Sequence, residues 1–549
     1  AQNYQIKGTV ISKTTHEPLE FVNVLVVGLN IGASTDVNGN FTINSVPPGI
    51  YQLRASTIGY KTVFTEEYRV NHITPHINIE MEEESTSISE VTVTASPFRR
   101  VAESPVSLRV IGLQEIEKAP GANRDISRVV QNYPGVAFSP IGYRNDLIVR
   151  GGGPSENRFY LDGVEIPNIN HFSTQGASGG PVGLIDADLI RNVKFYSGAF
   201  PAHRGNALSS VLDFSLRDGS MERNSLKATL GASEVSLSSN GHIGDKTSYL
   251  VSVRQSYLQM LFKVLGLPFL PAYTDASFKI KTRFNDKNEL TVLGLGGLDR
   301  MKLNMDIDGD YAEYLLSYLP TIEQETFTLG GVYRHYAGNH VQSVTLSHSY
   351  LHNRNYKYQD NDDSNPDNLN LDLGSVEQET KLRVENTSEW DSWKMNAGFE
   401  LNYTHYTNDT YQKVFTDVLR EFNYDTRLNM LRWGIYASAD YTSFDDRFTA
   451  SLGVRTDGNN YSDKMKELWR QLSPRLSVSY RLIDGLYLSG HMGLYYQLPA
   501  YTALGYKNNE YVYVNKDLDY TSVTQESLGL TWNPTETMEV SAEGFYKKY

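Results

Sequence analysis

A run of three glycines after a basic residue is the first candidate for chemistry in this sequence. It comprises Arg150, Gly151, Gly152 and Gly153. A glycine run after a strand can form a phosphate cradle, because bare backbone lets N–H groups approach an anion, provided that a helix follows. Here Pro154 leads instead into RFYLDGVEI, an aromatic and β-branched run interrupted by Asp162-Gly163. The pattern favours a tight turn between two strands, followed by a hairpin at Asp162-Gly163.

Catalytic and metal-binding motifs are not found elsewhere in the sequence. It contains neither H-E-x-x-H nor G-x-S-x-G, and LGLGGL around Gly294 is typical of a strand. The acidic stretches 306–310 and 360–368 have the carboxylate density that calcium prefers. Neither has the spacing of an EF-hand with its final glutamate, so we interpret both as solvated loops. We therefore predict a protein that is not an enzyme and that has no cofactor and no resident metal.

The composition limits the partners and the compartment. The formal net charge of −14 argues against nucleic acid, because binding to phosphates needs a basic face. The chain has no cysteine and therefore tolerates an oxidising compartment. Its longest apolar run, which begins at Phe21, is too short for a transmembrane helix. The first residues, AQNYQIKG, are typical of a chain from which a secretory signal has been cleaved.

Residues 1–82 alternate apolar and polar positions between turn signals such as Asn38-Gly39 and Pro48-Gly49. This alternation predicts a small all-β sandwich. The order of LEFVNVLV and STDVNGNFTINSVPPGIYQLRASTIGYK resembles the carboxypeptidase-regulatory-like domain over its whole length. The resemblance implies a non-catalytic accessory domain in the periplasm.

Residues 83–100 form an acidic, Ser/Thr-rich stretch that ends in the basic pair Arg99-Arg100. Its low apolar content predicts a flexible linker. Within it, the segment SEVTVTA alternates apolar and polar side chains, so it is either an ordinary linker strand or a peptide that adds to another protein's sheet. This segment comprises Ser89, Glu90, Val91, Thr92, Val93, Thr94 and Ala95.

Residues 101–218 are rich in glycine and contain, in order, NYPGV, IVRGGG, LDGVEIPN, IRNVKFYSGAFPAHRG and SSVLDFSLRDG. This order resembles the plug domain of TonB-dependent outer-membrane receptors. The resemblance implies a small mixed α/β plug inside a β-barrel, in which the glycine run is a compact bend and Asp162-Gly163 closes the next hairpin. It also implies that SEVTVTA, just before the plug, is the TonB box, whose partner is TonB with its inner-membrane energising complex.

Residues 219–549 repeat alternating segments of about 9 to 14 residues, as transmembrane β-strands do. In FTASLGVR, the apolar side chains of Phe448 and Leu452 alternate with the polar ones of Thr449 and Ser451. Short connections such as GDK alternate with long polar loops such as YKYQDNDDSNPDNLNLDLGS. This asymmetry is typical of an outer-membrane barrel, and we count about fifteen strands.

The predicted fold class is therefore mainly β: an N-terminal β-sandwich, a small mixed α/β plug and a large antiparallel transmembrane β-barrel. Plugged transporters close at about 22 strands. Unpaired backbone groups at an open edge cost several kcal/mol each in lipid. We therefore expect this barrel to need about seven strands more than the fifteen counted.

The resemblance also suggests which residues meet a ligand and which hold the plug. Apical loops of a plug would present Tyr143, Arg144, Asn145 and His171 to a ligand arriving from outside, although these residues can equally pack on the barrel wall. Buried Arg150 needs a partner, since a charge is costly without one. Lumen-facing carboxylates of the class of Glu539 or Glu543 can supply it.

Two functions remain open. The first is TonB-dependent import of a siderophore, glycan or peptide ligand across the outer membrane, with the N-terminal domain and TonB box in the periplasm and the long loops extracellular. The alternative is a plugged-barrel surface adhesin or scaffold that moves nothing. The N-terminal sandwich fits the bacterial group of the SusC-like importers, whose IRG-x-x-S…VVDG form this plug lacks. A surface lipoprotein is accordingly a weaker candidate partner than TonB, outer-membrane lipid and the ligand.

Overall fold

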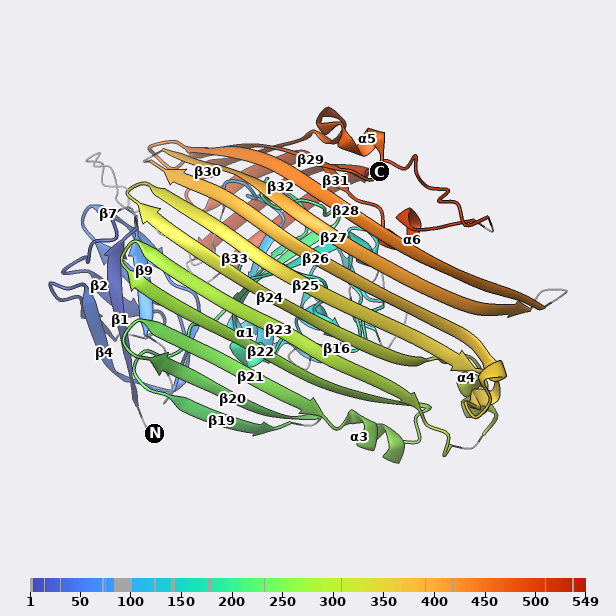
Figure 1. The fold of residues 1–549 in the computed structure, drawn as a ribbon. Coiled ribbons are helices and arrows are strands. Elements are labelled where there is room, and N and C mark those ends of the chain that lie inside the picture. The colour runs from blue at the N-terminus through green and yellow to red at the C-terminus, as the bar shows by residue number, and fades with distance from the viewer. Residues whose placement is uncertain are drawn as a thin grey trace.

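A computed structural model of the chain has three parts, namely an N-terminal domain, a plug and a curved sheet around the plug (Figure 1). The structure describes residues 3–13, 15–29, 31–71, 74, 76–82, 101–122, 125–139, 144–174, 179–231, 233–307, 309–390, 392–415, 419–508, 510–535 and 538–549. Residues 89–95 and Tyr143, both singled out by the sequence, lie outside these ranges. In the described ranges, no helix combines the length and the apolar character needed to cross a membrane.

The N-terminal domain packs two small sheets over one apolar core. Their orders are β4-β1-β9 and β3-β2-β6-β7, beside the pair β5-β8. The strands are β1 (Tyr4–Ser12), β2 (Asn23–Val26), β3 (Gly32–Ser34), β4 (Asn40–Val46), β5 (Gly49–Tyr51), β6 (Leu53–Thr57), β7 (Tyr60–Phe64), β8 (Tyr68–Val70) and β9 (Ile77–Met81). Alternate residues of β1, including Ile6 and Val10, are fully buried in this core, as period-two patterning requires. The all-β class predicted for this domain is confirmed.

The plug is built on a five-stranded sheet of order β10-β17-β18-β13-β14, in which β13 and β18 are parallel. Its main elements are β10 (Leu108–Ile111), α1 (Leu113–Lys118), α2 (Ile126–Val130), β13 (Asn157–Leu161), β14 (Val164–Ile166), β17 (Ile190–Tyr196) and β18 (Ser210–Leu216). Minor elements are β11 (Val136–Ala137), β12 (Ile148–Val149), η1 (Pro154–Glu156), β15 (Asn170–His171), β16 (Val182–Gly183) and η2 (Ala187–Leu189).

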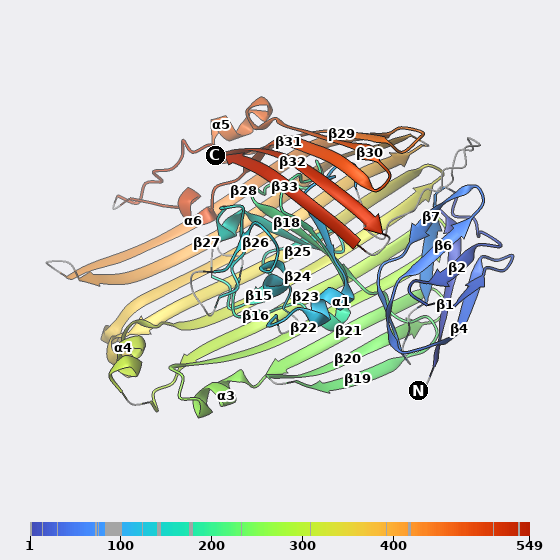
Figure 2. The same cartoon turned by 180° about the vertical axis from the view of Figure 1, so that it is seen from behind.

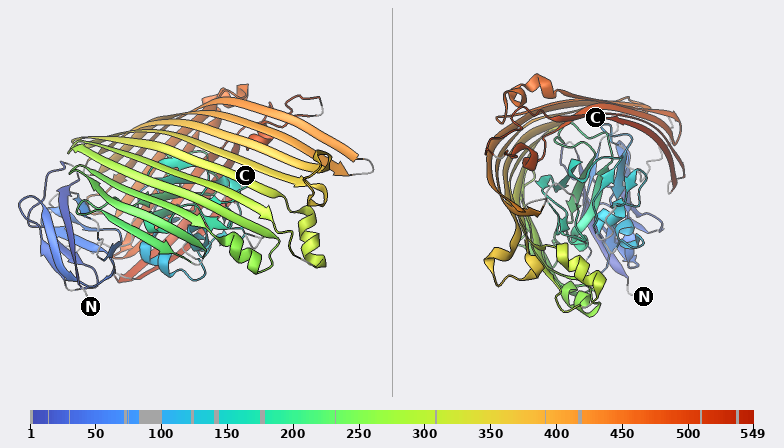
Figure 3. Two further views of the ribbon diagram at one scale, coloured as in Figure 1. Left: turned by 60° about the horizontal axis from the view of Figure 1, so that its bottom comes forward. Right: turned by 90° about the vertical axis from the view of Figure 1, so that its right-hand side faces the viewer.

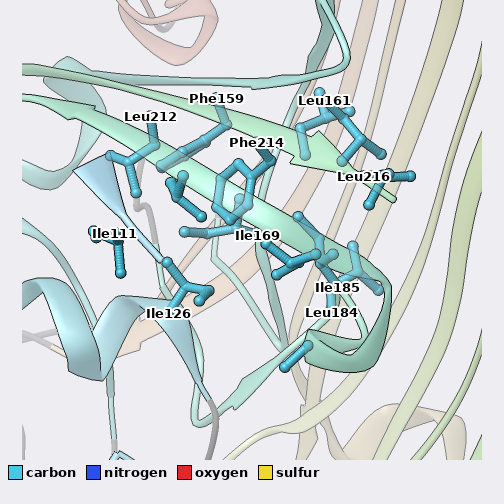
Figure 4. Packing of buried hydrophobic residues seen from close by; sticks show 14 of the residues in the cluster. Ile111, Ile126, Phe159, Leu161, Ile169, Leu184, Ile185, Leu212, Phe214 and Leu216 are labelled. Atoms are coloured by element: carbon cyan, nitrogen blue, oxygen red, sulfur yellow. The ribbon is translucent and has the colours of Figure 1, made fainter. Parts of the chain in front are cut away.

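The two faces of the plug sheet differ in character. One face is apolar, and Figure 4 shows Phe159, Leu212 and Phe214 packing toward Ile111 and Ile126 below the sheet. Since successive residues of a strand point to opposite faces, the intervening positions form a second face toward the barrel sheet, which is polar at Lys194 and Asp213 and apolar at Tyr160 and Val211. The plug core therefore continues into apolar residues of the barrel wall, and the plug meets the barrel through both polar and apolar groups.

The glycine run forms the bend that the sequence predicts. Arg150 and Gly151 both have positive φ (50° and 75°), and the chain continues through the single turn η1 into β13. The carboxylate of Glu156 accepts a hydrogen bond from the Gly153 N–H at 3.1 Å. The loop is therefore occupied by a side chain of its own, and the preference for a turn over a phosphate cradle is consistent with this geometry.

The hairpin at Asp162-Gly163 also forms as predicted. Leu161 pairs with Val164, and the two residues between them have φ of 46° and 88°. Positive φ at both central positions defines a type I′ turn, for which Asp-Gly is a preferred sequence. This hairpin directs β14 back along the barrel wall.

Fifteen antiparallel strands, β19 to β33, form the barrel sheet in sequence order. They are β19 (Ser225–Leu230), β20 (Glu234–Ile243), β21 (Thr247–Ser256), β22 (Phe269–Asn285), β23 (Asn288–Leu303), β24 (Thr321–Ala337), β25 (His340–Tyr358), β26 (Leu369–Glu389), β27 (Trp393–Phe415), β28 (Leu419–Thr442), β29 (Phe448–Asn459), β30 (Ser473–Ile483), β31 (Leu486–Gln497), β32 (Thr521–Thr535) and β33 (Met538–Lys548). The number of strands predicted from the sequence is confirmed.

The barrel sheet curves around the plug, which is visible between β19 and β33 in Figure 2 and within the arc in the right-hand view of Figure 3. Leu452 on the outer face is 62% exposed, whereas its neighbour Arg455 on the inner face is buried. The N-terminal domain lies at the end of the sheet that carries the short turns, and the helices α3 (Leu258–Val264) and α4 (Asp310–Tyr318) lie at the other end (Figure 3).

Several strands are longer than the sequence pattern predicts. β27 and β28 have 23 and 24 residues, and the loop expected between β25 and β26 shrinks to 359–368. The ladder continues to Tyr358 and Leu369 because polar residues above the membrane still satisfy their backbone groups by pairing. The expected limit of 14 residues was therefore wrong, since it followed the apolar alternation alone.

Candidate functional site

Arg150 forms one of several polar contacts between the plug and the barrel sheet. Its Nη2 atom donates to Glu543 Oε1 of β33 at 2.6 Å and to the hydroxyls of Ser107 and Ser197 at 3.0 Å. The guanidinium also lies over the ring of Phe545, 4.5 Å from its centroid. We call Arg150, Ser107, Ser197 and Glu543 the Arg150 latch. Of the two carboxylates considered from the sequence, Glu543 pairs with Arg150.

Glu539 has a different partner in the same region. Its carboxylate accepts from Arg109 of β10 at 3.0 Å. Two basic residues from different plug elements therefore contact the same barrel strand. Such charge-assisted bonds are strong in a partly buried site, yet they can exchange with water when the surfaces separate.

His171 forms a second contact, on the other side of the plug. Its Nδ1 lies 2.6 Å from Asp299 of β23 and its Nε2 lies 3.0 Å from Asp275 of β22. Arg254 of β21 also binds Asp275, at 2.9 Å. Burial lowers the pKa of His171, but the carboxylates of Asp299 and Asp275 outweigh burial and raise it to about 9. We call His171, Asp275, Asp299 and Arg254 the His171 cluster.

The residues predicted to contact a ligand do not all lie at one place in the structure. His171 is fully buried against the wall, and Asn145 is also buried, with its amide donating to Asp125 at 2.9 Å. Arg144 pairs with Asp146 at 2.7 Å. Arg144 and Asn145 therefore lie together, whereas His171 lies on the wall. Their role in binding a ligand stays a prediction.

Glycines on the inner wall permit close approach of the plug. A Cβ at Gly297 would lie 2.8 Å from Leu184, and one at Gly330 would lie 2.6 Å from Val164. The prediction of a strand at LGLGGL is confirmed, since Gly294 lies in β23. Gly294 itself contacts Phe278 of β22, so it is the neighbouring Gly297 that makes room for the plug.

The long connection between β31 and β32 packs onto the inner wall, which sequence patterns did not indicate. Leu428 and Met430 of β28 are buried beneath this connection, with Leu498 and Leu504. Nearby, Arg432 pairs with Glu379 at 2.8 Å, and the Tyr501 hydroxyl donates to the same carboxylate. Apolar residues on the lumen side of an alternating strand such as β28 are the signal that could have indicated that a loop packs against this strand.

The N-terminal domain contacts both the plug and the barrel, a second feature that the sequence did not reveal. Glu66 pairs with Arg191 of the plug at 2.6 Å, and Lys13 pairs with Glu389 beside a short turn at 2.7 Å. The Gln114 N–H at the start of α1 donates to Glu67 at 2.9 Å. These side chains are charged and look like ordinary surface residues in the sequence.

The geometry is that of a plug held inside a curved antiparallel sheet by polar and apolar contacts. Within the described residues, no cluster of three or more His, Asp or Glu side chains could hold a metal ion. A family model for the TonB-dependent receptor-like β-barrel matches residues 237–549, more than half of the chain. The chain belongs to the TonB-dependent receptor family. Models for the TonB-dependent receptor plug domain and the CarboxypepD_reg-like domain match residues 100–211 and 6–93.

A curated relative is the TonB-dependent transporter Oar of Myxococcus xanthus, 25% identical over 235 residues, or 40% of this chain. This chain spans about a fifth of that relative's length, with 21% covered. Among solved structures, a mutant of the ferric enterobactin receptor of Pseudomonas aeruginosa has a TM-score of 0.60 at 15% identity, covering 82% of this chain and 72% of that one. The siderophore receptor PirA of Acinetobacter baumannii has a TM-score of 0.60 at 16% identity, with the same coverage.

A third solved structure shares the fold. The outer membrane transporter YddB of Escherichia coli has a TM-score of 0.57 at 12% identity and covers 78% of this chain and 67% of that one. As a member of this receptor family, the chain is an outer-membrane protein. The family and the fold are those of receptors and transporters.

Proposed function

We propose that this receptor imports a ligand into the periplasm with energy that TonB transmits through residues 89–95, and that it is not an enzyme. The observation that carries the proposal is that two contacts of the plug with the barrel wall, on different strands, are made by polar and charged groups. The Arg150 latch and the His171 cluster hold the plug through hydrogen bonds and ion pairs that water can replace.

The first plug residues after residue 100 support the direction of pull. The Glu103 carbonyl accepts from Ser477 of β30 at 2.8 Å, and the Glu103 carboxylate lies 3.9 Å from Lys394 of β27. Val106 packs close to Gly529 of β32, where an added Cβ would lie 2.8 Å from it. Tension on the preceding segment would reach these contacts before it reaches the plug core.

The ligand class remains siderophore, glycan or peptide. The solved neighbours named as ferric enterobactin and siderophore receptors make a siderophore one candidate. Arg144 with Asn145 is the proposed ligand contact on the plug. Outer-membrane lipid and, less strongly, a surface lipoprotein are the further partners proposed.

The experiment compares proline and alanine in the proposed TonB box of the intact receptor. Strand addition draws affinity from main-chain hydrogen bonds, and proline removes a donor and fixes φ. Val93→Pro should weaken binding of the TonB periplasmic domain at least about tenfold, as expected for a lost hydrogen bond with added strain. Val91→Ala, which keeps the donor, should change this affinity little.

Uptake in cells completes the comparison. Val93→Pro should abolish receptor-dependent uptake while surface expression stays normal, and Val91→Ala should preserve it. If the proline variant binds TonB and imports as well as wild type, residues 89–95 are only a linker and the proposed mechanism is wrong.

A further inference from the structure

A polar cavity lies between the plug and the barrel sheet, apart from the Arg150 latch and the His171 cluster. Its volume is about 370 Å³, and its plug side is the polar face of β17 and β18. Its barrel side comes from the parts of β22 to β27 that are nearest the short turns. Nearly every lining side chain is polar or charged, with eight Lys or Arg and five Asp or Glu. The cavity is therefore built to hold polar or charged matter.

Carboxylates behind the lining compensate part of this positive charge. Glu66 pairs with Arg191 at 2.6 Å, and Glu289 pairs with Arg334 at 2.9 Å. Of three further cations in the lining, Arg204 pairs with Asp213 and Arg383 pairs with Glu385, whereas Lys194 has no ion pair in the described part of the chain. These three cations therefore face two carboxylate partners, which leaves one positive group without a paired carboxylate among the described residues.

Arg204 and Arg383 both have N–H donors without a hydrogen-bond partner among the described residues. Arg204 is 5% exposed; one of its nitrogens donates to Asp213 at 2.5 Å, while Nε and Nη1 find no partner among the described residues. Nε of Arg383, a residue 9% exposed, likewise has no hydrogen-bond partner in the described part of the chain. Buried donors without acceptors are costly, so they favour an acceptor that enters the cavity.

The environment of His203 is consistent with a positive potential at this point. His203 lines the cavity beside Arg204. Burial lowers its pKa most, and the charges of Arg204, Arg383, Lys394 and Arg475 lower it further. No carboxylate is among the main influences on this histidine. A neutral imidazole surrounded by cations is consistent with a place where an anion would be stabilised.

We propose that this cavity is a binding site for a small oxyanion of the phosphate or carboxylate class, held by Arg204, Arg383 and Lys194. Guanidinium groups suit such anions because their N–H groups match two oxygens at once. Lys194 adds a point charge from the plug sheet, directly across from Asp213 in the register of β17 and β18. Binding here does not require the plug to move, so the site exists whether or not the receptor imports anything.

The test is calorimetric titration of the purified full chain in detergent with inorganic phosphate. One saturable site is expected. Lys194→Gln, which keeps the side-chain stem, should weaken phosphate binding about tenfold, as the loss of a charged hydrogen bond implies. The matched control is Lys118→Gln on the exposed surface of α1, which should leave the affinity unchanged. Arg204→Lys, which retains the charge opposite Asp213, should also weaken binding.

Glycerol 3-phosphate distinguishes a free ion from an anionic group on a larger molecule. A site for free oxyanions should bind inorganic phosphate more tightly than the ester, whereas a site for an anionic substituent should bind the ester at least as tightly. Either order supports the proposal. If wild type shows no saturable binding of either probe, or if Lys194→Gln binds like Lys118→Gln, the cavity holds only water and the proposal is wrong.

Discussion

Replacing Glu543 by Gln should loosen the plug by an amount that the Arg150 latch allows us to estimate. The side chain of Arg150 is 8% exposed and that of Glu543 is 25% exposed. Removing one partner of a fully buried ion pair costs about 3–5 kcal/mol. Glu543 is only partly buried and Arg150 keeps Ser107 and Ser197, so we expect about 2 kcal/mol, less than for a fully buried pair. This corresponds to about a thirtyfold rise in the population with the latch open.

Hydrogen exchange measures that population directly. The Arg150 N–H donates to the Gly135 carbonyl at 2.7 Å, so its exchange reports opening of the bend. In Glu543→Gln, peptides covering 148–153 should exchange about thirtyfold faster than in wild type. Glu526→Gln on neighbouring β32 is the matched control, because Glu526 is exposed. Equal exchange in the two variants would refute the role assigned to the latch.

Two further predictions concern the opposite wall. Because the pKa of His171 is raised to about 9 from an ordinary 6.5, its contribution is complete below pH 6.5 and is lost as the pH rises through 9. Hydrogen exchange around His171, corrected for intrinsic rates, should therefore accelerate over that interval in wild type but not in His171→Asn. Gly330→Ala should destabilise the plug in its place against the wall by about 1–3 kcal/mol through overpacking. Gly331→Ala is the control, because a Cβ there would have nothing within 4 Å. Thermal unfolding should give a lower midpoint for Gly330→Ala than for Gly331→Ala, and equal midpoints would contradict this prediction.

The fold was largely predictable because local signals repeat along the chain. Alternation in segments such as FTASLGVR, and Asp-Gly at 162–163, each determine local geometry through period-two patterning and positive φ. Strand ends were less predictable, since above the membrane pairing continues without apolar residues. β27 and β28 extend beyond expectation for that reason.

The site was only partly predictable because its contacts join residues far apart in the sequence. A buried Arg150 implies some carboxylate, but the choice of Glu543 over Glu539 depends on how the plug is rotated inside the barrel. His171 shows the same limit, since its position in an apical loop did not reveal Asp275 and Asp299 on the wall. Contacts of the N-terminal domain were missed because its charged residues look like ordinary surface residues.

The central claim is that TonB pulls the plug away from the wall, and a single cysteine measures this most directly. The chain has no cysteine of its own, so a reporter at one site is unambiguous. Ala207 in the plug is 2% exposed and packs in an apolar cluster with Tyr495 and Val523 of the wall. In energised cells, Ala207→Cys should be labelled by a membrane-impermeant maleimide, and loss of TonB or Val93→Pro should prevent labelling. Labelling that is equally fast with and without TonB would contradict the account.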